Sequence, residues 1–174
     1  MSALDNNVET TNMLSPFGFK LEIKRLPNVQ WFVQAINIPG ITTQPINLGT
    51  PFTNIRKAGD HIEYEDLNIT FKIDEMLNGY FEIHNWIRGL GFPEDFEEYA
   101  NLKNKPDWTN SGLFSEIDLF VLDSAKKPIY IVKFEDAFPY GISSLNFNTT
   151  DTNVNHITVN TLFKYTKFEF EKVI

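Results

Sequence analysis

The stretch over residues 62–91 constrains the fold most, because the period of its apolar residues changes within a few positions. Its first part alternates apolar with polar residues, at Leu67, Ile69, Phe71 and Ile73, which is typical of a strand with one buried face. Its second part has apolar residues every three or four positions, at Met76, Tyr80, Ile83, Ile87 and Leu90. That spacing predicts an amphipathic helix over about residues 75–89. Asp74 precedes the stripe and is placed to cap the helix.

Most other periodic segments are strand-like. Strands are predicted over residues 17–24, 30–38, 117–122, 129–134, 142–149 and 157–170; residues 117–122 are almost wholly apolar, as in a strand covered on both faces. A turn at residues 26–28 suggests that the first two strands form a hairpin, and residues 136–141 are expected to turn a corner. Slips in the apolar register near Glu65–Asp66 and Thr166 predict β-bulges. Phe96, Tyr99 and Leu102 are spaced for one further short helical turn.

These segments predict a mainly β (α+β) fold, an antiparallel β-sandwich or flattened barrel with one flanking α-helix. Residues 1–15 show no periodicity and are expected to form a flexible N-terminal arm. Residues 16–174 are long enough for a single domain with its own core.

Residues 40–60 do not fit the sandwich. With Pro39, this stretch holds three prolines and three glycines, and proline removes the donors that a central strand needs. It nevertheless carries large apolar side chains, at Ile41, Ile46, Leu48, Phe52 and Ile55. Long loops are uncommon unless they serve a function. Two interpretations remain: an irregular segment that folds back over its own core, or an extended hairpin arm that reaches another subunit.

Composition excludes several classes of function. The chain has no cysteine, so disulfides and thiolate chemistry are excluded. No apolar run approaches the roughly 20 residues of a membrane helix, and no membrane insertion is expected. The net charge of −8 argues against a surface that holds nucleic acid, because such surfaces need clustered Lys and Arg.

No catalytic, cofactor or metal site is predicted. Of the three histidines, His61, His84 and His156, His84 lies on the predicted helix with no His, Asp or Cys at ligand spacing, and Glu82 two residues before it lies on another face. The acid pairs fall in turns, a bulge and a surface helix, where solvated carboxylates are usual, although two acids across a cleft would be needed for a glycosidase. Trp31 and Trp108 leave open a carbohydrate-binding β-sandwich as an alternative of another class. Trp86 lies beside the helical stripe, where a core position is more usual.

The order of these segments resembles the tail tube proteins of contractile-tailed (myovirus-type) bacteriophages, including tube-like baseplate initiators. The resemblance covers roughly residues 16–172. It is carried by Pro39-Gly40, by Ala58-Gly59-Asp60 within IRKAGDHIEYEDLNITFKIDE, and by a strand leading into a helix that contains Trp86.

The resemblance implies a structural virion protein and not an enzyme. In that family six subunits form a ring, and stacked rings form the conduit for DNA ejection. Expected partners are copies of the chain, the tail sheath, baseplate and tail-terminator proteins, and DNA in transit. The expected location is the phage tail, assembled in the host cytoplasm. A tube initiator or tail-completion protein of the same fold is the alternative within the family.

The resemblance also assigns surfaces. Inter-ring or inter-subunit contacts are expected at Ile41, Ile46, Leu48, Phe52, Ile55, Arg56 and Lys57. A lumen wall of polar residues with few cations would let phosphates slide past. The candidates for that wall are Ser144, Asn146, Asn148, Thr158 and Asn160.

Overall fold

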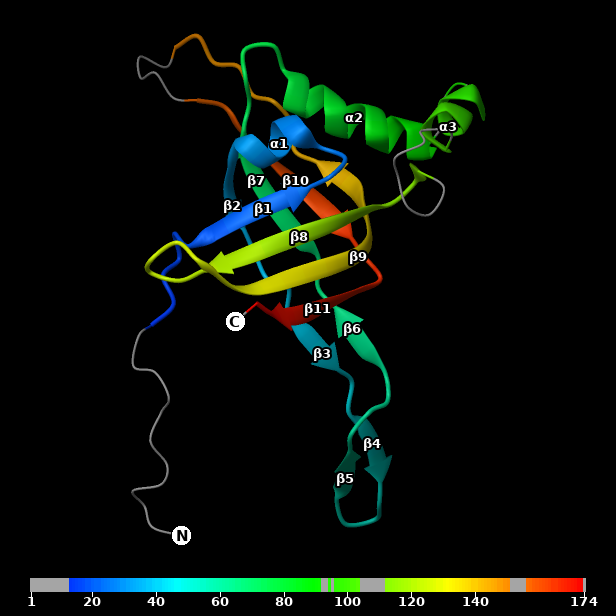
Figure 1. Ribbon diagram of the computed structural model, residues 1–174. Coiled ribbons are helices and arrows are strands. Elements are labelled where there is room, and N and C mark those ends of the chain that lie inside the picture. Colours follow the sequence, from blue (N-terminus) through cyan, green and yellow to red (C-terminus); the bar gives the residue numbers. More distant parts are fainter. Residues whose placement is uncertain (1–12, 92–93, 95, 104–111, 151–155, 174) are drawn as a thin grey trace.

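The computed structural model describes residues 13–91, 94, 96–103, 112–150 and 156–173. Most of the predicted N-terminal arm and Trp108 lie outside these described residues. In Figure 1 the described chain has three parts along one axis: helices at one end, strands in the middle, and a projecting ribbon at the other end. The predicted mainly β class with an extended arm is confirmed.

Two antiparallel layers share one long strand, β9 (Pro128–Ile142). Its first half pairs with β8 (Ser115–Leu122) and β11 (Lys167–Lys172), and β8 pairs with β1 (Phe19–Ile23). Its second half pairs with β10 (Thr158–Lys164), which continues to β7 (Leu67–Lys72) and β2 (Val33–Ile36). We call these layers sheet A (β1, β8, β9, β11) and sheet B (β9, β10, β7, β2). The sheet does not close into a barrel, since β1 and β2 end its strand order.

Strand β9 corrects two predictions. The expected corner at residues 136–141 lies inside the strand, and residues 143–150 do not form the expected separate strand. The reason is Asp136, whose φ of 54° inserts a left-handed residue into the strand. The alternation therefore slips: Val132 and Phe134 are buried before Asp136, and Ala137 and Pro139 after it. Such a slip inside a bent strand has the sequence pattern of a turn.

The expected hairpin of the first two strands is also wrong. Pro27 begins a short helix, α1 (Pro27–Trp31), where its fixed φ suits the first helical turn. Leu26 and Val29 bury their side chains in the core. The chain thereby crosses from one layer to the other, and β2 pairs with β7 of sheet B instead of with β1.

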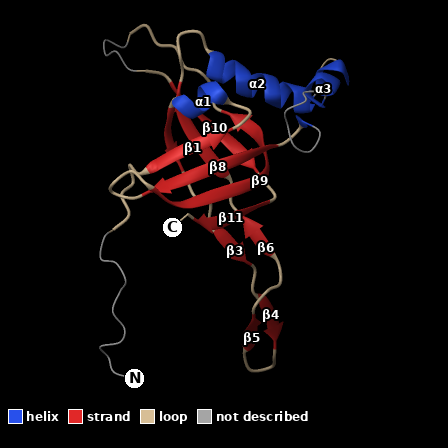
Figure 2. Cartoon of the chain, viewed as in Figure 1, coloured by secondary structure: helices blue, strands red, loops and turns tan. Residues whose placement is uncertain are grey.

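Helix α2 (Asn78–Gly91) covers one end of the sandwich, as Figure 2 shows. Ile83 and Trp86 are buried, and the indole of Trp86 meets the ring of Phe163 edge-on at 6.2 Å between centroids. This confirms Trp86 as a core residue. The helix then meets α3 (Phe96–Lys103), the predicted short helical turn, so the described chain has three helices where one flanking helix was expected.

Helix α2 begins three residues later than predicted. Leu77 has a φ of 57°, so residues 74–77 form a turn and Met76 is exposed outside the apolar stripe. The Asp74 carboxylate accepts a hydrogen bond from the side chain of Asn78 at 2.8 Å instead of from the helix backbone. Within the described residues, no helix has both the length and the apolarity required to cross a bilayer.

The Pro/Gly-rich stretch forms a two-stranded ribbon that projects away from the helices (Figure 1). We call residues 41–64 the arm. Its near part pairs β3 (Ile41–Thr43) with β6 (Ile62–Tyr64), and its far part pairs β4 (Ile46–Gly49) with β5 (Asn54–Lys57). The predicted irregularity at Glu65–Asp66 separates β6 from β7.

Candidate assembly surfaces

The far part of the arm has one apolar and one polar face. Ile46 pairs with Lys57 and Leu48 pairs with Ile55, and cross-strand partners share a face. The opposite face carries Asn47, Asn54 and Arg56. The three apolar side chains stay between 42% and 50% exposed. The ribbon is therefore amphipathic, but its apolar side has no cover within the described chain.

The apolar side chains in the rest of the arm are also exposed. In the near part Ile41 is 53% exposed and Ile62 is 51% exposed, and Phe52 at the tip is 97% exposed. The interpretation in which this stretch folds back over its own core is therefore wrong. A lone two-stranded ribbon is marginally stable in water, and a continuous apolar patch usually marks an interaction surface. The predicted contact residues lie on this ribbon, the apolar ones exposed and Arg56 on its polar face.

The outgoing and returning segments of the arm cross at Gly59. A Cβ at this position would lie 1.9 Å from the carbonyl oxygen of Gln44, closer than any real contact. Glycine therefore lets the ribbon twist between its near and far parts, beside the conformationally fixed Pro45. This gives a physical reason for the glycine in the Ala58-Gly59-Asp60 segment.

The root of the arm is fixed to the sandwich by aromatic packing. Tyr64, the last residue of β6, meets Tyr165 at 5.8 Å and Phe168 at 5.5 Å between ring centroids. Both rings in turn contact Phe134 in the core, at 5.1 Å and 5.6 Å. The near part of the arm thus continues the core, while the far part does not.

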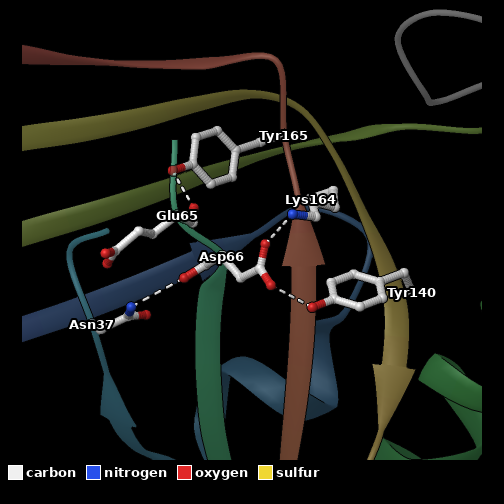
Figure 3. A network of polar contacts seen from close by, with 6 residues as sticks. All are labelled: Asn37, Glu65, Asp66, Tyr140, Lys164 and Tyr165. Carbon is white, nitrogen blue, oxygen red and sulfur yellow. Dashed lines mark hydrogen bonds and ion pairs between the residues drawn. The ribbon is translucent and has the colours of Figure 1, made fainter. Parts of the chain in front are cut away.

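Polar contacts hold the same root (Figure 3). The Glu65 carboxylate accepts the backbone N–H of Gly40 at 3.2 Å, and the Tyr165 hydroxyl donates to the backbone oxygen of Glu65 at 2.8 Å. The Asp66 carboxylate pairs with the Lys164 ammonium and accepts a hydrogen bond from the Tyr140 hydroxyl. These contacts tie the arm to β9 and β10, so its direction is set by the sandwich.

The polar groups at the root shift the pKa values of their partners. The Lys164 ammonium, and then the Tyr140 hydroxyl, lower the pKa of the Asp66 carboxyl. The hydrogen bond to Asp66 raises the pKa of Lys164, and also that of Tyr140. Burial raises the pKa of Tyr165 to about 12, so its hydroxyl keeps its proton as a donor at neutral pH.

The lumen candidates fall into two groups. Thr158 and Asn160 lie on the outer face of sheet B, where their partners are Lys72 and Thr70 of β7. Sequence reasoning missed Asn68 and Thr70 as members of this face, although their alternation with buried residues in β7 was visible. Ser144, Asn146 and Asn148 are exposed but lie on the segment that follows β9, outside any strand.

No enzyme-like arrangement appears in the described chain. None of its His, Asp and Glu side chains form a group of three or more that could hold a metal ion. Trp31 is 81% exposed at the end of α1 whereas Trp86 is buried, so these two do not form a joint platform for a sugar.

The fold and these surfaces agree with comparisons to known proteins. No family model matches the chain. The tail tube terminator protein of Enterobacteria phage T4 is 26% identical over 147 residues, which is 80% of this chain and 76% of the relative. The chain is related to the tube proteins of contractile tails. It is a structural protein of that group and not an enzyme, as predicted.

Solved structures show the same fold. The tube-terminating cap of the anti-feeding prophage superposes with a TM-score of 0.63, at 12% identity, over 99% of this chain and 100% of that one. The sheath/tube terminator of the extracellular contractile injection system PVC, in its extended state, gives a TM-score of 0.59 at 9% identity. That match covers 92% of this chain and 97% of the terminator.

A test of the crossing point uses two glycines of the arm. Gly59→Ala forces a methyl group onto Gln44 and should open the ribbon, whereas a Cβ at Gly49 meets only the Asn54 side chain at 3.8 Å. We expect trypsin to cut after Arg56 and Lys57 at least several-fold faster in Gly59→Ala than in Gly49→Ala, because an open ribbon fits a protease cleft. Equal cutting rates in the two variants would show that the crossing does not hold the arm.

A test of the root uses pH. Asp66→Asn should lower the free energy of unfolding by at most about 1 kcal/mol at pH 7, because the Lys164 pair is partly exposed. The Asp66 pKa is lowered by folding, so its contribution exists above the unfolded value of about 4 and is lost as pH falls below it. Urea unfolding should therefore separate the two proteins most at pH 7 and less as pH falls through the folded pKa of Asp66. Asp60→Asn, at an exposed acid, is the control, and a gap that does not shrink between pH 7 and pH 3 would contradict the assignment.

Proposed function

We propose that this chain forms the ring that ends the tube of a contractile tail. The single observation that carries the proposal is the sequence similarity to the T4 tail tube terminator over most of both chains. The fold shared with two further terminating caps supports it, although fold alone does not separate a terminator from the tube body. This refines the prediction of a tube-body ring and favours the alternative of a tail-completion protein.

The proposed assembly is a closed ring of six copies, as the family resemblance implies. The arm supplies its inter-subunit contacts through Ile41, Ile46, Leu48, Phe52 and Ile55, with Arg56 and Lys57 beside them. The support is physical: these side chains are exposed on a ribbon whose root is rigid. A preformed ribbon loses little conformational freedom on docking, which favours binding.

The outer face of sheet B is proposed to line the channel. Its central positions, Asn68, Thr70, Thr158 and Asn160, are uncharged; Lys72 and Lys164 lie on the same face, and Lys164 is paired with Asp66. Few cations on a wall mean few sites that trap phosphates, so DNA can slide. Ser144, Asn146 and Asn148 stay candidates for the rim of the channel. Proposed partners are the last tube ring, the sheath and its terminator, with the baseplate at the far end of the tail.

The first prediction concerns position and copy number. A gold label on this chain in purified tails should appear at one end of each tube, as one ring's worth of copies, in electron micrographs. Particles that lack the chain should carry tubes of uncontrolled length, because nothing stops further rings. Label distributed along the whole tube would instead identify a tube-body protein, and label at the baseplate end would identify an initiator.

The second prediction concerns the channel. Thr70→Lys together with Asn160→Lys places two cations on neighbouring strands and should slow DNA ejection in vitro, with an effect that fades at high salt. The control is Ser124→Lys with Ala125→Lys, which adds the same charge in the exposed β8–β9 turn. Unchanged ejection from normally assembled particles, or equal slowing by the control, would remove sheet B from the channel wall.

A further inference from the structure

The outer part of the arm is cationic in an acidic protein, whereas Asp60 and Glu63 lie closer to the root. Residues 41–58 contain Arg56 and Lys57 and no Asp or Glu. The whole chain carries −8 and this segment +2, so the rest of the chain carries −10. Neither cation forms an ion pair with the described residues. Lys57 lies on the apolar face, directly opposite Ile46. The surface that covers this face must therefore be both apolar and acidic.

The other end of the molecule has this character. Trp31 and Phe32 end α1 and are 81% and 45% exposed, while Met76 and Phe81 flank the start of α2 and are 77% and 51% exposed. Acidic side chains lie among them, at Asp74, Glu75 and Glu82. We call these seven residues the helix-end patch.

Contacts between α1 and α2 bring the patch together. Asn28 of α1 donates to the Glu82 carboxylate at 2.6 Å, and the backbone oxygen of Phe32 accepts the N–H of Lys72, two residues before Asp74. Burial raises the pKa of Glu82, and the charge of Asp74 raises it further. Within the described chain, Glu75 forms no ion pair.

The two surfaces cannot meet within one molecule. Figure 1 shows α1 and α2 at the end of the sandwich away from the arm, and the root contacts fix the direction in which the arm leaves. A contact between them therefore joins two molecules. It is also heterologous, because two different surfaces meet: the arm of one copy and the helix-end patch of another.

We propose that the arm of one copy docks against the helix-end patch of a second copy, with Lys57 facing Glu75 and the apolar face of the ribbon covering Trp31 and Phe81. This rests on the proposed function only in that both require copies of the chain to meet. A heterologous contact closes into a ring when its rotation allows. A closed ring uses every arm, so none is left to recruit a further ring. That property suits a component that ends a tube.

The experiment measures self-association of the purified full chain by sedimentation at low and high salt. Lys57→Glu and Glu75→Lys should each weaken association about fivefold to tenfold at low salt, the range expected for an exposed ion pair turned into a like-charge contact. Both substitutions in one chain should restore it, because the pair is then reversed but still complementary. High salt should weaken the wild-type association.

Controls separate this contact from general charge effects. Lys172→Glu and Glu22→Lys change the net charge equally at exposed positions on other faces and should leave association unchanged. Trp31→Ala should weaken association about tenfold or more, as buried interface aromatics do, whereas Phe17→Ala, at a ring 80% exposed elsewhere, should not.

Three results would overturn the proposal. These are a doubly substituted chain no stronger than the single variants, controls that act like the test substitutions, and a chain that stays monomeric at all concentrations. The proposed function is tested separately by where the label lies on whole tails. A chain that sits at the tube end but associates through other surfaces would refute this contact alone.

Discussion

Burial of apolar surface governs both the sandwich and the arm. The sandwich covers its own apolar faces, whereas the apolar face of the arm needs a surface from elsewhere. In the sandwich, the inner faces of sheets A and B cover each other, and helix α2 covers one end with Trp86. In the arm, Ile46, Leu48 and Ile55 form the same kind of face, and no second layer from the described residues covers it. The hydrophobic effect acts on both faces alike. Within the part of the chain that the structure describes, the apolar faces of the sandwich are covered and that of the arm is not.

An exposed apolar ribbon is useful only if its position is fixed. A ribbon free to swing would lose its freedom on binding, and that loss would weaken the contact. Here Tyr64 packs on the aromatic core, and Asp66 is paired with Lys164 of β10. The twist at Gly59 then sets how the far apolar face is turned relative to the body. A fixed root and an exposed apolar tip therefore both favour docking of the arm onto another surface.

Sequence reasoning succeeded where one local pattern decides the structure. The alternation through Phe71 and the helical stripe around Ile83 each describe a single element packed on one face, and both were found. The Pro/Gly stretch was recognised because apolar residues between prolines fit neither a core strand nor a solvent loop. The contact residues assigned to the arm rest on the same argument and stay a prediction.

The failures share a different cause. Whether β2 pairs with β1 or β7 depends on the direction that the chain takes after α1. Val29 of α1 is buried because α2 packs against it, and that contact is not visible in the sequence. The bend at Asp136 resembles a turn because a strand that passes from one layer to another must slip its alternation. The polar root was missed for the same reason, since Tyr140 and Lys164 are far from Asp66 in sequence.

The distribution of charge adds a direction to the assembly. Apolar faces alone would join copies in any orientation that buries enough surface, because the hydrophobic effect is not directional. In the proposed contact, the cations Arg56 and Lys57 near the tip of the arm face acidic side chains around Trp31, so unlike ends attract and like ends repel. Head-to-tail association is then favoured over the two-fold pairing of arms that their exposed apolar faces would otherwise permit. Under the proposed contact, the complementarity of the two ends decides whether copies of this sandwich keep adding or stop when a ring closes.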